Sequence, residues 1–316
     1  MAYSPKVRNI LLAALLFGWG VTLIYQAFKT STSAPKLYRD NRILMGTFWE
    51  VSSPDPKASQ IVFQEGARIE ELLSKYKTTS EIFQLNRLGK LKVSPETFFI
   101  IKKSKEFSAL SNGAFDITVG PLIDLWGFTR QNYRIPTPEE IQATLKLIGS
   151  EKIILQENDN VVVFKVPGMK IDLGAIAKGF ALDCAIKKLK AKNITRCLIN
   201  AGGQVYGLGD NFGQNWKIGI KGRTNSEISS VLELRDNSAS TSADYEQFFV
   251  KDGKSYGHIL DPRTGYPSEA GFFSVTVVSN NALTADALST AIFVLGKTQG
   301  LDLAAKFKDL TVKIIP

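Results

Sequence analysis

The single histidine of the 316-residue chain, His258, lies in the segment YGHILDPRTG, residues 256–265. It follows the end of a predicted strand and precedes a turn that contains Asp261 and Arg263. Histidine is the side chain whose unperturbed pKa best suits proton transfer near neutral pH. A lone histidine can equally be a residue held by strand packing. The segment alone therefore leaves both a catalytic and a structural role open.

A candidate cation site lies in the segment TADALSTA, residues 284–291, where Asp286 and Thr290 are four residues apart and share one face of a predicted helix. A carboxylate, a hydroxyl and a backbone carbonyl form an all-oxygen set that suits Mg²⁺ with water and ligand phosphates. A carboxylate near a helix start is also favourable without an ion, so a structural role is the alternative. The sequence has no Cys/His cluster for zinc and no G-x-S-x-G element of a serine hydrolase.

The segment KIDLGAIAKGFALDCA, residues 170–185, is a candidate site for a phosphate group. A predicted strand leads to Asp172, a helix is expected to begin at Gly174, and Lys178 lies one turn later. The unpaired N–H groups of a first helical turn favour an anion. The segment matches neither a dinucleotide-binding glycine pattern nor a P-loop, so it does not identify a ligand by itself.

Two more segments combine glycine with polar groups. In GAFDITVGPLIDLWGF, residues 113–128, Asp116 stands between apolar neighbours, where an Asx turn is the alternative to a ligand contact. Gly202 and Gly203 follow a predicted strand and could let a ligand approach the backbone, although a plain tight turn explains them equally well.

The elements that must position these residues mix helices and strands without regular alternation. This order predicts an α+β fold with mixed or antiparallel sheets rather than a doubly wound parallel sheet. Asp252 and Gly253 are predicted to form the turn of a hairpin. The expected helices cover about 59–76, 94–113, 137–149 and 283–295, and the expected strands include 43–51, 161–166, 197–200, 216–221, 231–234, 245–260 (the hairpin) and 272–278.

The composition is that of an ordinary globular protein with a formal net charge of +9. No Lys/Arg block carries interleaved aromatic residues, so nucleic-acid binding is not expected. A mildly positive field would suit a phosphate-bearing ligand. Cys184 and Cys197 lie in apolar surroundings and are expected to be two packed thiols rather than a disulfide or metal ligands.

Residues 10–28 contain no charged side chain and follow Lys6 and Arg8. Their length is near the lower limit for a membrane-spanning helix and exceeds a typical signal-peptide core. We therefore expect residues 1–30 to be an N-terminal membrane anchor, with a cleaved signal as the alternative, residues 31–42 to be a tether, and residues 43–316 to be the functional domain. The positive N-terminus places that domain on the exported side of the membrane.

In chain order, the ordered set MGTFWEV, SKYKTTSEIFQLN, GAFDITVGPLIDLWGF, IDLGAIAKG, NAGG, TSADYEQFF, HILDPRTG and ADALSTA resembles the ApbE-type FAD:protein FMN transferases over about residues 43–296. The resemblance implies an ApbE-like, T-fold-like architecture. It also implies Mg²⁺-dependent transfer of FMN from FAD to a threonine hydroxyl of an exported or membrane protein, with release of AMP. Typical acceptors are subunits of membrane redox complexes, which would place this chain at the bacterial cytoplasmic membrane, with its domain on the periplasmic or extracellular side.

Roles for individual residues follow from the same resemblance. His258, Asp286 and Lys178 are the expected catalytic residues, with His258 accepting the proton of the threonine. Lys178 is not expected to be indispensable, because the residue at its position varies in the family. The expected metal ligands are Asp286, Thr290 and the carbonyl of Ala175. The expected FAD-binding residues are Met45, Tyr76, Ala114, Phe115, Asp116, Asp172, Lys178 and Ile259.

Two departures from the family pattern are small. Ala243 and Ala175 stand where other members often have glycine, and Ala175 still offers its carbonyl. Two other functions remain open at this point. The same site could hydrolyse FAD to FMN and AMP with water as acceptor, or the chain could be an exported protein that stores or delivers FAD.

Overall fold

The computed structural model describes residues 36–224, 227–243 and 247–316. The predicted membrane anchor, residues 1–30, and most of the predicted tether lie outside these residues. Within the described ranges, no helix is both long enough and apolar enough to cross a membrane. All elements below belong to one compact unit, Tyr38–Pro316.

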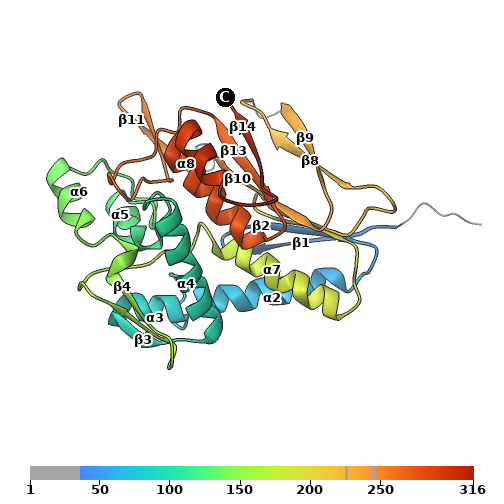
Figure 1. The fold of residues 1–316 in the computed structure, drawn as a ribbon, viewed down its shortest axis with the longest axis horizontal. Coiled ribbons are helices and arrows are strands. Elements are labelled where there is room, and N and C mark those ends of the chain that lie inside the picture. The colour runs from blue at the N-terminus through green and yellow to red at the C-terminus, as the bar shows by residue number, and fades with distance from the viewer. Residues whose placement is uncertain (1–35, 225–226, 244–246) are drawn as a thin grey trace, which may run out of the picture. The chain divides into compact units, whose positions relative to one another are not determined.

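A seven-stranded sheet forms the centre of this unit (Figure 1). Each neighbouring pair of strands is antiparallel, which confirms the predicted α+β class. Side chains alternate between the two faces, so β6 buries Cys197, Ile199 and Ala201 on one face. The strands, in spatial order, are β1 (Tyr38–Leu44), β2 (Thr47–Ser53), β6 (Cys197–Ala201), β7 (Gln204–Leu208), β10 (Asn237–Ala243), β13 (Ser274–Ser279) and β14 (Thr311–Ile315).

Three helices pack against this sheet and against one another: α2 (Ala58–Leu73) beside α7 (Ala177–Ala191), and α7 beside α8 (Ala282–Ala304). In α2 the apolar residues recur every three or four positions and are buried against the sheet. The predicted end of the last helix at Gly296 is confirmed as a break, because Gly296 has φ 75° inside α8 and a second helical piece follows it.

A second group of elements, drawn in cyan and green in Figure 1, includes a three-stranded sheet. Ser94 caps its longest helix, and Thr137 with Glu140 forms the predicted capping box. The helices are α3 (Glu81–Leu88), α4 (Pro95–Leu110), α5 (Gly120–Leu125), α6 (Pro138–Leu145), and the 3₁₀ turns η1 (Ile117–Val119) and η2 (Ser150–Lys152). The strands are β3 (Lys90–Lys92), β4 (Ile153–Gln156) and β5 (Val161–Phe164).

Two hairpins complete the unit: β8 (Trp216–Lys221) with β9 (Ile228–Leu234), and β11 (Phe248–Lys251) with β12 (Lys254–Gly257). In the second hairpin, Asp252 and Gly253 have φ 53° and 75°, which confirms the predicted turn. The β11–β12 hairpin leads directly into His258.

Several predicted boundaries are wrong. The expected strand 43–51 is the end of β1, a turn at Met45 and Gly46 with φ 50° and 72°, and most of β2. Residues 38–42, expected in the tether, form most of β1 because they pair with β2. The helix expected at 59–76 ends at Leu73, which leaves Tyr76 in a loop, and the helix expected from Gly174 begins at Ala177 after a turn.

Buried apolar side chains form two separate clusters. The larger cluster lies between the seven-stranded sheet and helices α2, α7 and α8, and it includes the buried apolar residues of α4. The smaller is centred on Trp126 and includes Leu122, Phe128 and Leu260. The indole of Trp126 donates to the carbonyl of Gly265 at 2.8 Å, which ties this cluster to the turn after His258.

Candidate active site

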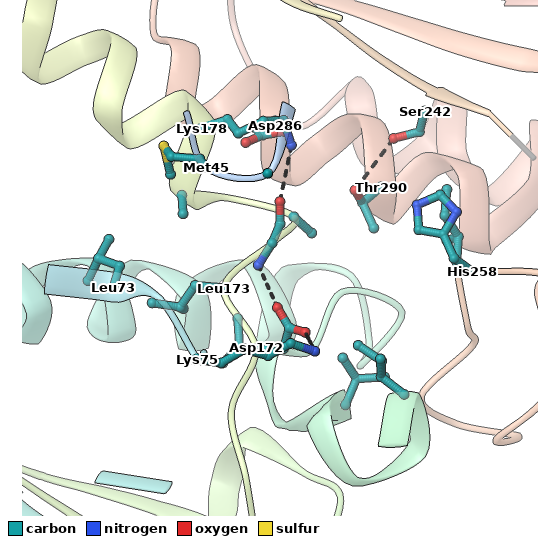
Figure 2. A pocket seen from close by; sticks show the side chains of 18 of the residues that line it. Met45, Leu73, Lys75, Asp172, Leu173, Lys178, Ser242, His258, Asp286 and Thr290 are labelled. Atoms are coloured by element: carbon teal, nitrogen blue, oxygen red, sulfur yellow. Dashed lines mark hydrogen bonds and ion pairs between the residues drawn. The ribbon is translucent and has the colours of Figure 1, made fainter. Parts of the chain in front are cut away.

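A cavity of about 580 Å³ lies where the β1–β2 turn, the loop after α2, the turn before α7, the end of β12 and helix α8 meet (Figure 2). Every predicted site residue lines it, although these residues come from distant parts of the chain. They are Met45, Tyr76, Ala114, Phe115, Asp116, Asp172, Ala175, Lys178, His258, Ile259, Asp286 and Thr290.

Asp286 is the most enclosed carboxylate of the cavity, at 3% exposure. Its Oδ2 accepts the backbone N–H of Gly179 at 2.9 Å, and the ammonium of Lys178 lies 3.8 Å from Oδ1. A Cβ on Gly179 would lie 2.3 Å from the carbonyl oxygen of Ala282. Glycine is therefore required where α7 meets α8. One N–H of the first turn of α7, predicted to be open to an anion, instead binds the protein's own carboxylate.

A row of hydroxyl groups extends from Asp286 along the wall of the cavity. Ser240 donates to Asp286 Oδ1 at 3.4 Å and accepts from Ser289 at 3.2 Å, and Ser289 accepts in turn from Ser242 at 2.9 Å. The Ser242 and Thr290 hydroxyls lie 3.4 Å apart. The serines of β10 were not predicted as site residues, although their alternation in NSASTSA places them on one face of the strand.

The oxygen atoms here fit a hard divalent cation. Asp286 and Thr290 lie one turn apart on α8, both line the cavity, and the predicted third ligand, Ala175, lines it as well. Carboxylate, hydroxyl and carbonyl oxygens are the ligands that Mg²⁺ takes, and none of the three is a sulfur or imidazole donor. The donor set therefore agrees with the predicted ion.

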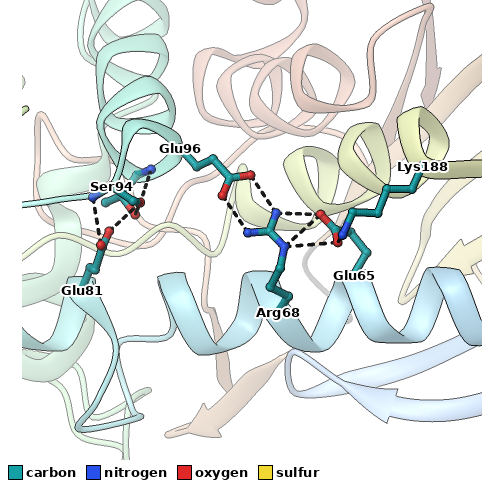
Figure 3. Close-up of polar contacts among 7 residues, drawn as sticks. Glu65, Arg68, Glu81, Ser94, Glu96 and Lys188 are labelled. Atoms are coloured by element: carbon teal, nitrogen blue, oxygen red, sulfur yellow. Dashed lines mark hydrogen bonds and ion pairs between the residues drawn. The ribbon is translucent and has the colours of Figure 1, made fainter. Parts of the chain in front are cut away.

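Elsewhere in the described residues, one group of three potential metal-binding side chains occurs: Glu65, Glu96 and Cys184. Arg68 lies between its two carboxylates, 2.6 Å from Glu65 and 2.7 Å from Glu96, and Lys188 also pairs with Glu65 (Figure 3). Burial raises the pKa of the Cys184 thiol to about 12. Because the guanidinium of Arg68 occupies the space between the carboxylates and the thiol of Cys184 is protonated, these side chains do not form a metal site. Their ion pairs instead join α2, α4 and α7.

Asp172 connects two walls of the cavity. Its Oδ2 pairs with the ammonium of Lys75 at 2.6 Å, and its Oδ1 accepts the N–H of Gly174 at 2.8 Å (Figure 2). The carbonyl of Gly174 in turn accepts from Lys178 Nζ at 3.2 Å. These contacts fix the turn that contains Ala175.

Lys75 is a site residue that the sequence analysis missed. Its side chain is only 14% exposed. Burial alone would lower the pKa of this ammonium group, but the neighbouring Asp172 carboxylate outweighs burial and raises it. The ammonium also lies 5.0 Å from the ring centre of Tyr76. No local sequence signal distinguishes Lys75 from the other lysines of this segment, because its partner is 97 positions away.

Asp116 lines the cavity, but its carboxylate is already bonded to the protein. Oδ1 accepts the N–H of Thr118 at 2.8 Å and its hydroxyl at 2.7 Å. Oδ2 accepts from Ser108 at 3.2 Å and from the N–H of Ser150 at 2.8 Å. The alternative Asx turn is therefore present, and Asp116 shapes the wall to which Ala114 and Phe115 belong.

His258 is held by a backbone carbonyl. Its own N–H and its ring Nδ1 both lie within hydrogen-bond distance of the carbonyl oxygen of Gln247, at 2.9 and 3.0 Å. A carbonyl can only accept, so Nδ1 carries the proton and the lone pair of the neutral ring is on Nε2. Burial lowers the pKa of His258, and this outweighs the opposite effect of the Gln247 carbonyl.

The turn after His258 is stabilised from within. The backbone N–H and the Nε of Arg263 both donate to Asp261 Oδ1 at 2.9 Å, and its Nη2 donates to Oδ2 at 2.8 Å. Asp261 and Arg263 therefore hold this turn together through their own side chains.

The sequence pattern described as the ApbE family matches residues 45–314. Among curated proteins, an FAD:protein FMN transferase of Klebsiella pneumoniae is 34% identical over 282 residues, covering 87% of this chain and 88% of the relative. The FAD:protein FMN transferase of Escherichia coli K12 is 33% identical over 316 residues, covering 95% and 89%.

Solved structures of ApbE proteins are also similar to this chain. The crystal structure of the ApbE protein from Thermotoga maritima has a TM-score of 0.82 and 35% identity, covering 88% of this chain and 94% of that one. The flavin transferase ApbE from Vibrio cholerae has a TM-score of 0.78 and 28% identity, covering 88% and 94%.

Proposed function

Since the chain belongs to the ApbE family and is an FAD:protein FMN transferase, we propose that it transfers FMN from FAD, with Mg²⁺, to a threonine hydroxyl of its protein acceptor. In this reaction the threonine oxygen forms a bond to the phosphorus of the FMN half. The bond from that phosphorus to the bridging oxygen breaks, and AMP leaves with the bridging oxygen. The threonine proton needs an acceptor within the site.

One observation carries the proposal. A neutral histidine with a free lone pair on Nε2 lines the same cavity as an oxygen donor set suited to Mg²⁺. His258 would accept the threonine proton at Nε2 while Gln247 keeps the ring oriented. Positioning and proton acceptance are the contributions that phosphoryl transfer requires of the protein.

Asp286, Thr290 and the carbonyl of Ala175 would hold Mg²⁺, which when bound supplies positive charge to the phosphate oxygens. Lys178 adds a second cation 3.8 Å from Asp286. Met45, Tyr76, Ala114, Phe115 and Ile259 would form the walls against the flavin nucleotide, with Asp116 and Asp172 keeping the backbone of those walls in place.

The acceptor is proposed to be an exported or membrane protein, such as a subunit of a membrane redox complex, reached from the periplasmic or extracellular side. Support for this comes from the uncharged segment 10–28, which follows two basic residues. We therefore propose that residues 1–30 hold the chain at the cytoplasmic membrane.

The test is to incubate the chain with FAD, Mg²⁺ and a threonine-containing acceptor peptide, and to separate the products by mass. Peptide heavier by one FMN less one water, with one AMP released per transfer, is the expected result. Free FMN without modified peptide would make the chain an FAD pyrophosphatase. Bound but unchanged FAD would make it a storage protein, and either result would overturn the proposal. Omission of Mg²⁺ should stop the reaction.

A further inference from the structure

A second cavity, of about 610 Å³, adjoins the first, and Lys75 and Tyr76 line both. We call it the basic cavity. Apart from Tyr76, none of its lining residues has a role in the proposed reaction. Its lining residues come from the loop after α2, helices α3 and α5, and the segments 129–132 and 170–171. They are Lys75, Tyr76, Phe83, Asn86, Arg87, Gly120, Asp124, Thr129, Arg130, Asn132, Lys170 and Ile171.

Its charge is unbalanced. Four of the lining residues are basic and one, Asp124, is acidic. Asp124 is already engaged by Lys170 at 2.7 Å and by the hydroxyl of Thr129 at 2.5 Å. Lys75 is likewise paired, with Asp172 of the first cavity. The positive charge of the basic cavity that has no carboxylate partner therefore belongs to Arg87 and Arg130.

These two arginines have no acidic partner within the described part of the chain. Arg87 donates to the neutral side-chain amide of Gln84 at 2.7 Å, and no hydrogen bond or ion pair to a described residue involves Arg130. Both side chains are exposed. A guanidinium with open donors binds a carboxylate through two parallel hydrogen bonds, and does so better than an ammonium group.

Tyr76, a residue that is 63% exposed, lines both cavities and so lies where they adjoin. Beside it lies the ammonium of Lys75, 5.0 Å from the ring centre. An extended peptide that occupies the basic cavity could pass over this ring and enter the mouth of the first cavity. The enzyme must accommodate a protein acceptor there as well as FAD.

We propose that the basic cavity docks an acidic stretch of the acceptor protein, with Arg87 and Arg130 binding its carboxylates. This inference rests on the proposed function, since it concerns the second substrate of the same site. Opposite charges across an interface raise the rate of encounter and select among partners. Exposed charges are screened by salt, so this docking weakens as ionic strength rises.

The experiment uses the full chain with FAD and three fluorescent peptides of equal length with one central threonine, flanked by aspartates, asparagines or lysines. Binding is followed by fluorescence anisotropy, and covalent flavin is followed separately by mass. The variant Arg87→Glu/Arg130→Glu is compared with Lys187→Glu/Lys190→Glu. That control makes the same change in net charge toward the far end of α7, on side chains that are also exposed.

The wild-type chain should bind the aspartate peptide most tightly. The arginine variant should weaken that binding by roughly tenfold or more and should now favour the lysine peptide. The control variant should bind all three peptides as the wild type does, and FAD affinity should be unchanged in both variants.

Equal binding of the three peptides, or an arginine variant that binds the aspartate peptide normally, would overturn the inference. So would a large loss of FAD affinity in the arginine variant, which would assign the basic cavity to the nucleotide. Charge-dependent binding without any covalent flavin would support the docking site and reject the proposed transfer, so the two failures can be told apart.

Discussion

His258 is oriented by a neutral carbonyl rather than by a carboxylate, which distinguishes it from the histidine of a Ser-His-Asp triad. A carboxylate partner would favour the charged ring, whereas the buried setting of His258 lowers its pKa. The neutral form, which alone can accept a proton, therefore persists to lower pH than for a free histidine. The same depressed pKa means that this group's contribution to folding stability is present above pH ~6.5 and is lost as pH falls below it.

His258→Ala should lower the rate of FMN transfer by roughly 10²- to 10⁴-fold, because general-base catalysis is lost. The wild-type rate should fall on the acidic side, with a midpoint below the usual histidine pKa. This fall in rate at acidic pH should be absent from the pH profile of His258→Ala. Single-turnover transfer measured between pH 5 and 9, together with FAD affinity, checks this.

His258→Asn is the matched control, since its amide can still donate to the carbonyl of Gln247 but cannot act as a base. It should keep the melting temperature and FAD affinity of the wild type and lose transfer as His258→Ala does. If the asparagine variant transfers FMN at a near wild-type rate, His258 has only a structural role.

Asp286→Asn should abolish Mg²⁺-dependent turnover, because it removes the charged ligand of the proposed cation site. The amide oxygen can still accept the N–H of Gly179, so the fold should change little. The rate is measured against Mg²⁺ concentration, and binding of the metal alone by calorimetry. Asp302→Asn, an exposed position on the same helix, serves as control. Unchanged Mg²⁺ dependence in Asp286→Asn would reject this ligand assignment.

The twelve residues expected from the family resemblance all line one cavity, and their individual roles stay predictions. The sequence did not predict Lys75, Ser240, Ser242 or the carbonyl of Gln247. Each of these acts through a partner from another element, such as Asp172 for Lys75. Local patterns give residue type and spacing, but these contacts exist only once helices and strands have packed.

Helices α7 and α8 meet end to side, and this junction positions both Asp286 and the turn before α7. Asp183 of α7 accepts the N–H groups of Ala282 and Leu283 at 2.9 and 3.0 Å and the amide of Asn281 at 2.7 Å. It thereby caps the start of α8 from outside the helix. The predicted caps at Ser94 and Thr137 are local in sequence, whereas this one is not and could not be predicted.

Burial raises the pKa of Asp183 from 3.8 to about 6, against the opposing effect of its three donors. As pH falls, Asp183 therefore binds a proton at a higher pH in the folded protein than in the unfolded chain. The stabilisation from this titration is complete below pH 3.8 and is lost as pH rises through about 6.

Asp183→Asn removes this titration. As pH falls from 7 to 4, the free energy of unfolding of the wild type should rise relative to that of the variant, by on the order of 1–3 kcal/mol. Urea unfolding of both proteins at several pH values measures the difference in their free energies of unfolding. The titration of all other groups contributes equally to both proteins and cancels in this difference. A difference that stays constant with pH, or shrinks toward pH 4, would contradict the assignment.

The compact unit Tyr38–Pro316 contains every residue of the cavity, so the segment before it is not needed to build the site. A chain that begins at Ser33 keeps β1 whole, and it should fold and transfer FMN to a soluble acceptor at the wild-type rate. Circular dichroism and the transfer assay check this. A folded but inactive shortened chain would show that residues 1–32 take part in the reaction.

The α+β class followed from the mixed order of helical and strand patterns, but the strand order of the seven-stranded sheet did not. Strands β2 and β6 are neighbours although more than 140 residues separate them, and β10 lies between β7 and β13. Periodicity reports which face of a strand is buried and carries no information on which strand lies beside it. The edge position of β1 was missed for the same reason.

The two apolar clusters support the proposed proton acceptor and the proposed cation ligands differently, because Ile259 and Leu260 after His258 pack against the larger and the smaller cluster respectively, whereas α8 packs in the larger one. Leu260 belongs to the smaller cluster, against which Tyr256 also packs, whereas Leu288 of α8 belongs to the larger one. Parts of a protein with separate cores exchange their amide hydrogens through local openings that need less free energy than global unfolding. An opening confined to the smaller cluster would release Leu260, two residues after His258, while α8 stays packed in the larger cluster. We therefore expect hydrogen–deuterium exchange to be faster in peptides of the Trp126 cluster than in peptides of the first half of α8.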